Sequence, residues 1–158
     1  MEEIYQILEN VKDPEIPVIS IVDLGIVREV RKQNSHVEID ITPTYSGCPA
    51  LDVIPVLIRD AMSKEGYDDV RVKNILSPAW TTDWISENGL QQLKEYGIAP
   101  PVEKTSDKSF LMEGPKKVPC PFCNSENTKL VSQFGSTPCK AAYQCNECLE
   151  PFDYFKCH

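Results

Sequence analysis

Residues 36–58 read HVEIDITPTYSGCPALDVIPVLI, and they decide the fold because the hydrophobic periodicity changes within them. At first every second residue is apolar, which is typical of a strand with one buried face. The apolar residues of this strand are Val37, Ile39 and Ile41. After a short polar loop, apolar residues recur three or four positions apart, which predicts a helix from Pro49 to about Glu65. A strand followed by an amphipathic helix predicts a sheet with a helix packed on one face.

Two prolines and a glycine mark the limits of this helix. Pro49 suits the first turn, where its missing N–H is not needed, and Gly66 suits the end. Pro55 lies inside the run and should kink the helix or delay its start. Cys48 therefore lies at the N-cap of the helix or directly before it.

Further elements lie on both sides of this stretch. Residues 1–11 have apolar side chains at helical spacing, and a proline-containing turn ends this first helix. Residues 26–32 predict a strand that pairs with the strand described above in a hairpin. Residues 69–76 predict a third strand, and residues 77–98 predict a broken helical segment. Together these elements predict a small α+β domain with a helix-covered sheet.

The chain is long enough for one ordinary domain and a small second module. We predict an α+β domain at residues 1–99. Residues 100–117 are proline-flanked, polar and without periodicity, which is typical of a linker. Six of the seven cysteines follow this segment, so residues 118–158 predict a β module of the zinc-ribbon type.

Composition limits the functions that the chain can have. No run approaches the roughly 20 apolar residues that a membrane span needs, and the acidic N-terminus is unlike a secretory signal. We therefore expect a cytoplasmic protein with reduced cysteines and no membrane partner. Residues 1–115 carry 11 basic against 20 acidic side chains, and residues 116–158 carry 5 against 4. Because an acidic body repels nucleic acid, we expect no nucleic-acid partner, and a nucleic-acid-binding ribbon is the weakest alternative.

The pairs CPFC and CNEC in the C-terminal module have the pattern of a metal site, and 21 residues separate them. Each CxxC turn directs two sulfurs to one side, and two such turns supply four thiolates in a tetrahedron. We expect Zn²⁺, because a segment this short cannot close a sufficient core without a metal. Four thiolates also suit iron, as a single ion or as a cluster. The expected ligands are Cys120, Cys123, Cys145 and Cys148.

Two further cysteines in this module, Cys139 and Cys157, have no partner in the CxxC pattern. Free cysteines are often buried as small apolar residues, and that is the simpler interpretation of both. The other interpretation is a second, more labile metal site, to which His158 would contribute.

Cys48 is the one cysteine outside the C-terminal module. At a helix N-terminus, free backbone N–H groups and the helix dipole favour the thiolate, so we expect a reactive cysteine with a lowered pKa. The alternative is a packing or capping residue. Asp13 and Glu15 lie in a turn and can simply end the first helix, so their residue types alone do not assign them to a site.

Five segments together resemble a known family. They are DPEIPVISIVDLGIV (13–27), TPTYSGCPA (42–50), SPAWTTDW (77–84), FGSTPCKA (134–141) and EPFDYFKCH (150–158). The first three resemble the small α+β family of iron–sulfur assembly factors that includes SufT and the domain preceding some Mrp-type ATPases. With the last two segments, the chain is most similar to the PaaD-like members of this family, which belong to bacterial phenylacetic acid degradation.

This resemblance assigns Cys48 to the family's single reactive cysteine and Asp13 and Glu15 to its acidic turn. It implies an accessory protein that assembles or maintains an iron–sulfur cluster, with Cys48 as a transient ligand of the cluster or of iron. The implied partners are components of phenylacetyl-CoA epoxidase, especially the iron–sulfur reductase. The sequence has no nucleotide-binding loop and no di-iron motif, so we do not expect an enzyme in its own right. The alternative is a structural subunit of the epoxidase complex that transfers nothing.

Overall fold

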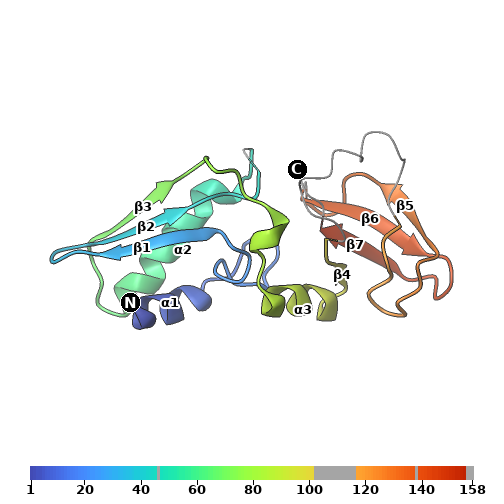
Figure 1. Ribbon diagram of the computed structural model, residues 1–158, viewed down its shortest axis with the longest axis horizontal. Helices are drawn as coiled ribbons and strands as arrows, with labels where there is room; N and C mark the ends of the chain where they lie inside the picture. The colour runs from blue at the N-terminus through green and yellow to red at the C-terminus, as the bar shows by residue number, and fades with distance from the viewer. Residues whose placement is uncertain (46, 102–116, 138, 156–158) are drawn as a thin grey trace. The chain divides into compact units, whose positions relative to one another are not determined.

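A computed structural model describes residues 1–45, 47–101, 117–137 and 139–155, which form two compact units (Figure 1). The first unit contains residues 1–80 and 84–89, and the second contains residues 81–83 and those from 90 onward. Helices and strands occur together, as the periodicity predicts, so the chain is α+β. None of the helices in the described ranges is long and apolar enough to cross a membrane.

The first unit follows the predicted order of a helix, a hairpin, a second helix and a third strand. Its elements are α1 (Glu2–Glu9), β1 (Val27–Lys32), β2 (Val37–Ile41), α2 (Ala50–Lys64) and β3 (Val70–Asn74). The sheet order is β1-β2-β3. The hairpin pairs β1 and β2 antiparallel, and the crossover through α2 makes β3 parallel to β2. The central strand β2 therefore leads directly into the loop that carries Cys48.

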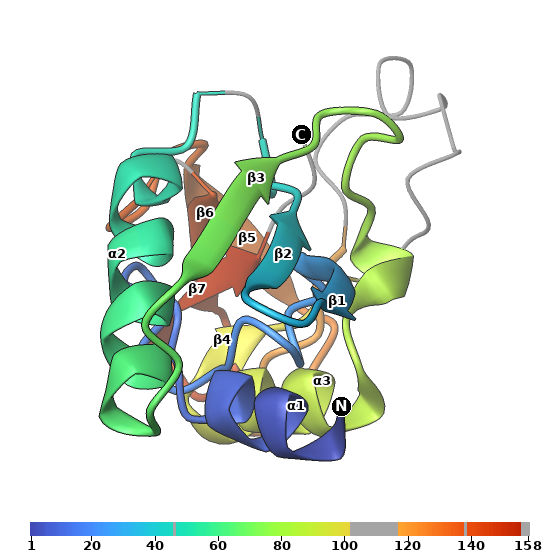
Figure 2. The same ribbon diagram turned by 90° about the vertical axis from the view of Figure 1, so that its left-hand side faces the viewer.

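Helix α2 covers one face of this sheet (Figures 1 and 2). The strand residues at alternate positions of β2 are buried, and the buried helix residues recur at helical spacing. The buried members from α2 are Ala50, Ile54, Ile58 and Met62. Pro55 lies within the helix but does not delay its start, because the helix already begins at Ala50. The apolar stripe outweighs the one backbone hydrogen bond that proline removes.

The segment after β3 is held to the first unit by polar contacts. The indole Nε1–H of Trp80 donates to the carbonyl of Leu24 at 2.9 Å. The side chain of Asp23 accepts hydrogen bonds from the hydroxyl of Ser86 (2.5 Å) and from the amide of Asn88 (3.0 Å). The predicted broken helical segment is a short 3₁₀ turn, Thr82–Trp84, followed by α3, Glu87–Glu95.

The second unit contains a four-stranded sheet in the order β4-β7-β6-β5. Its strands are β4 (Ile98–Ala99), β5 (Thr128–Ser132), β6 (Lys140–Cys145) and β7 (Pro151–Phe155). Strands β5, β6 and β7 are antiparallel, whereas β4 is parallel to β7. The compact units thus divide near Gly89, while residues 98–99 form a strand of the second sheet. Most of the predicted linker, residues 102–116, lies outside the described residues.

An aromatic group forms the core of this second sheet. The ring of Tyr143 stacks on Phe152 with 5.8 Å between centroids and meets the edge of Tyr154 at 5.7 Å. Two cysteines of the CxxC pairs, Cys120 and Cys145, are buried in the same cluster. The small aromatic core and the cysteine cluster are therefore continuous.

Candidate functional site

The structure brings the four cysteines of the two CxxC pairs together. Cys120 and Cys123 lie in the turn before β5, and Cys145 ends β6 three residues before Cys148. All four sulfurs lie within 4.8 Å of one another. The Cys120 and Cys148 sulfurs are 3.7 Å apart, and those of Cys123 and Cys145 are 3.6 Å apart. With Zn–S bonds of about 2.3 Å, a tetrahedral site has sulfur–sulfur edges of about 3.8 Å, so this donor set fits a zinc ion.

The two CxxC turns, here called the two knuckles, have the same backbone construction. The first residue of each pair donates its N–H to a carbonyl beyond the turn, from Cys120 to Ser125 (2.9 Å) and from Cys145 to Glu150 (3.0 Å). The residue after each pair adopts a left-handed conformation, with φ of 61° at Asn124 and 64° at Leu149. These left-handed residues turn the chain back, which leaves both sulfurs of a pair on one side.

Backbone N–H groups influence the charge of the thiols. Burial raises the pKa of Cys145, but the N–H groups of Cys148 and Glu147 outweigh it and lower this pKa to about 7. For Cys148 the N–H of Glu150 lowers the pKa, but burial and the neighbouring thiols raise it to about 12. Four crowded thiols therefore do not all ionise by themselves, and a divalent cation is what allows four thiolates in one place.

The other cysteines of this module lie elsewhere or outside the described residues. Cys139 is buried, and its sulfur lies 3.0 Å from the hydroxyl of Thr137. It does not belong to the group of four cysteines. Cys157 and His158 lie outside the described residues. The proposed second metal site therefore stays a prediction.

Cys48 lies between β2 and α2, at the position that the sequence predicts. Pro49 is the N-cap of α2, so Cys48 directly precedes the cap, and it is 8% exposed. Burial raises the pKa of the Cys48 thiol, the charges of Glu15 and Asp13 raise it further, and the Ala50 N–H and the Thr44 side chain lower it. The predicted lowering of this pKa is therefore wrong, because burial and two nearby carboxylates outweigh the helix N-terminus.

Asp13 has a defined structural role in the acidic turn. Its carboxylate oxygen Oδ1 accepts hydrogen bonds from the backbone N–H groups of Glu15 (2.8 Å) and Ile16 (2.9 Å). The side chain is 5% exposed, and the turn closes where the Asp13 N–H donates to the carbonyl of Ile19. The turn thereby brings both carboxylates close enough to Cys48 to act on its pKa. Spacing alone does not reveal this proximity, since the turn and Cys48 are far apart in the sequence.

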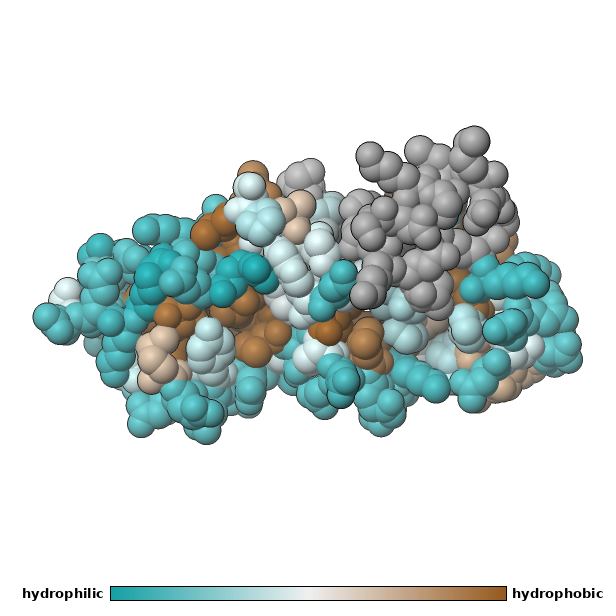
Figure 3. Space-filling model, in the orientation of Figure 1, coloured by the Kyte–Doolittle hydropathy of each residue, from teal (hydrophilic) through white to brown (hydrophobic). Residues whose placement is uncertain are grey.

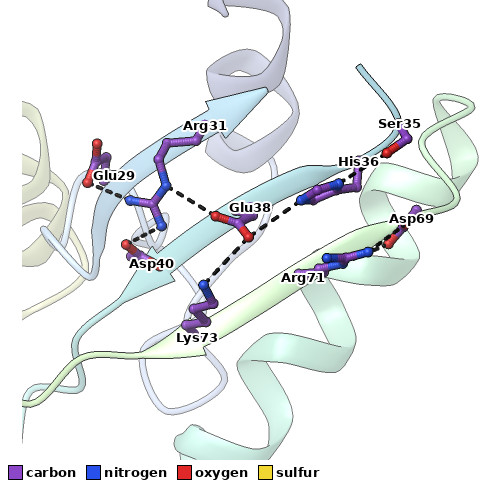
Figure 4. Close-up of polar contacts among 9 residues, drawn as sticks. All are labelled: Glu29, Arg31, Ser35, His36, Glu38, Asp40, Asp69, Arg71 and Lys73. Carbon is purple, nitrogen blue, oxygen red and sulfur yellow. Dashed lines mark hydrogen bonds and ion pairs between the residues drawn. The ribbon is translucent and has the colours of Figure 1, made fainter. Parts of the chain in front are cut away.

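A charged network covers the sheet face opposite α2, and sequence reasoning did not select it (Figure 4). The guanidinium of Arg31 contacts the carboxylates of Glu38 (3.3 Å) and Asp40 (2.7 Å). Glu38 also contacts Lys73 at 3.5 Å. The polar residues that alternate with Val37, Ile39 and Ile41 were the available signal. Hydrophilic surface lies over the hairpin end of β1 and β2 (Figure 3), and the network stabilises this end of the sheet.

Two family models match the chain, one for each unit. Residues 1–74 match the family described as iron–sulfur cluster assembly protein, and residues 104–156 match the PaaD zinc beta ribbon domain. A solved structure from Bacillus anthracis, a domain of unknown function of the DUF59 type, is 28% identical with a TM-score of 0.54. It covers 58% of this chain and 89% of its own chain.

Two relatives extend this comparison. An Escherichia coli (strain K12) protein, named as a subunit of 1,2-phenylacetyl-CoA epoxidase, is 48% identical over 99% of this chain and 93% of its own length. An Fe-S protein maturation auxiliary factor from Porphyromonas gingivalis is 34% identical over 58% of this chain and 89% of its own length. The first relative spans both units and the four-cysteine module. This chain therefore belongs to the PaaD family, in which an iron–sulfur-assembly domain precedes a zinc ribbon.

Proposed function

We propose that this chain is an accessory protein of phenylacetate catabolism that assembles or maintains an iron–sulfur cluster in the phenylacetyl-CoA epoxidase. The recipient is the iron–sulfur reductase of that enzyme. The name of the Escherichia coli relative supports the pathway, and the match of residues 1–74 to the assembly family supports the chemistry. The observation that carries the proposal is the buried Cys48 thiol beside the carboxylates of Asp13 and Glu15.

Cys48 would be the transient ligand of iron or of the cluster. A buried thiol with a raised pKa stays protonated, and therefore weakly reactive, until a metal displaces its proton. Glu15 would accept charge or proton density at that moment, while Asp13 holds the turn through its two backbone hydrogen bonds. The thiols stay reduced in the cytoplasm, which is where we place this function.

The four-cysteine module would hold Zn²⁺ and dock the recipient. Zinc is favoured because four cysteines in two CxxC knuckles form a closed structural site, with no position open for a substrate. The zinc ion, when bound, supplies a rigid crosslink between the knuckles. The chain's own residues supply the thiolates and the backbone N–H groups that support them.

The second candidate is a structural subunit that stays in the epoxidase complex and transfers nothing. The naming of the Escherichia coli relative as an epoxidase subunit favours it. The two candidates differ in what they require of Cys48, because a structural subunit needs only its fold.

Replacement of Cys48 by serine distinguishes them. We expect cells with Cys48→Ser to contain the soluble accessory protein but a reductase short of iron and acid-labile sulfide, and to grow poorly on phenylacetate. The matched control is Asp13→Asn, which keeps the Oδ1 acceptor of the turn. Circular dichroism of each purified variant verifies the fold. A fully loaded reductase and normal growth with Cys48→Ser would reject cluster transfer and leave the structural subunit.

A further inference from the structure

We propose that the four cysteines of the two knuckles also form a peroxide-responsive switch. In this switch each exposed thiol forms a disulfide with a buried thiol of the opposite knuckle, so that the metal leaves while the knuckles stay joined. The proposal goes beyond the role in cluster assembly and uses no residue of the Cys48 site. Its ligand is the metal of the four thiolates, and its oxidant is hydrogen peroxide.

Exposure divides the four thiols into two kinds. Cys123 and Cys148 are exposed, whereas Cys120 and Cys145 are fully buried. Each knuckle therefore has one sulfur that a small oxidant can reach and one that it cannot. The exposed sulfur is the second of the pair in CPFC and likewise the second in CNEC.

Distance pairs each exposed thiol with a buried one across the site. The Cys123 sulfur lies 3.6 Å from Cys145, and the Cys148 sulfur lies 3.7 Å from Cys120. Both contacts join different knuckles. A thiol attacked by peroxide therefore has a resolving thiol in van der Waals contact, and that thiol is shielded from the oxidant itself.

The chemistry balances with two molecules of peroxide for one metal ion. The exposed thiolate attacks peroxide, so that the O–O bond breaks, an S–O bond forms and hydroxide leaves. The buried thiolate then attacks the sulfenic sulfur, so that the S–S bond forms and the S–O bond breaks with loss of a second hydroxide. Two protons from solvent convert the hydroxides to water. Repetition at the second pair removes all four thiolates, and the divalent cation is released.

Crossed disulfides would preserve the arrangement that the metal enforces. They join residues 22 and 28 positions apart, so each connects the turn before β5 to the turn after β6. Disulfides within each CxxC pair would close only a short loop and leave the knuckles free to separate. Because a crosslink restrains the unfolded chain more when its loop is longer, the crossed form keeps the sheet folded without metal.

The experiment uses the full chain loaded with zinc and treated with two equivalents of hydrogen peroxide. A chromogenic chelator measures metal release, and acid quenching, alkylation and non-reducing peptide mass spectrometry locate the disulfides. We expect one metal ion released for two disulfides, Cys123–Cys145 and Cys120–Cys148. Disulfides within the pairs, disulfides between chains, or release without disulfides would each overturn the proposal.

Two variants test the assignment of attacked and resolving thiols. In Cys145→Ser the thiol of Cys123 has no resolving partner, so dimedone should label Cys123 while the disulfide of Cys120 with Cys148 still forms. In Cys120→Ser the label should move to Cys148. Label on the buried thiols instead would contradict the assignment. Since either variant can lose metal affinity, both are oxidised without metal, and the disulfide map of the unsubstituted chain decides the outcome in any case.

Discussion

Leu149 and Asn124 occupy matching positions, each directly after the second cysteine of its knuckle. Both have a left-handed backbone, and Leu149 is 67% exposed. Asparagine tolerates this conformation, whereas a leucine there costs about 1 kcal/mol. We therefore expect Leu149→Asn to stabilise the metal-loaded second unit by about 0.5–1 kcal/mol in urea unfolding. The matched control, Asn124→Leu, should destabilise it by a similar amount, and equal stabilities for both variants would contradict the strain argument.

Cys48 provides a second test at the scale of one residue. Burial and the charges of Glu15 and Asp13 raise its pKa above the usual 9.0, so the neutral thiol is the folded form at pH 7. This preference stabilises the fold below the unfolded pKa, and the stabilisation is lost as pH rises through the folded pKa. We expect Cys48 in the native protein to react slowly with iodoacetamide at pH 8 and to accelerate only above pH 9. The same residue in urea should accelerate about one pH unit or more earlier. Equal profiles would show that the thiol is not perturbed.

Helix α2 and the hairpin show which elements sequence reasoning can find. Their apolar residues repeat with one clear period over many positions, and burial of those residues against one another selects the same elements. The CxxC pairs are equally visible, because ligand spacing is a local property of the sequence.

Strand β4 and the surroundings of Cys48 show where sequence reasoning ends. Ile98 and Ala99 are too short a run for a period, and their partner Asp153 lies far along the chain. Likewise, the carboxylates that raise the pKa of Cys48 come from a distant turn. The helix N-terminus was visible in the sequence, but the burial and charges that outweigh it were tertiary properties.

At the scale of the molecule, each unit has its own sheet and buried core. Metal binding energy is folding energy only for the unit that supplies the ligands. We expect one zinc ion per chain, and its removal by a chelator at neutral pH under reducing conditions should expose β5, β6 and β7 to hydrogen exchange. Strand β2 and helix α2 should remain protected.

Two results would contradict this expectation. Stoichiometric iron and acid-labile sulfide at the four thiols, measured after purification without air, would replace zinc with a cluster. Simultaneous loss of protection in both sheets after chelation would show that the first unit depends on the metal. The matched control is Cys139→Ala, which removes a buried thiol outside the group of four and should leave the metal content unchanged.

The strand order has a consequence for synthesis on the ribosome. The first sheet has all its strands once residue 74 has emerged, because β3 is its last member. The second sheet cannot place β4 until β7, residues 151–155, has followed, since β7 is the neighbour of β4. Domains generally fold as units during translation, N-terminal units first. Cys48 therefore enters its folded environment while the thiols of the knuckles are still being added, and the nascent chain presents its metal-binding cysteines only after its lone thiol has been enclosed.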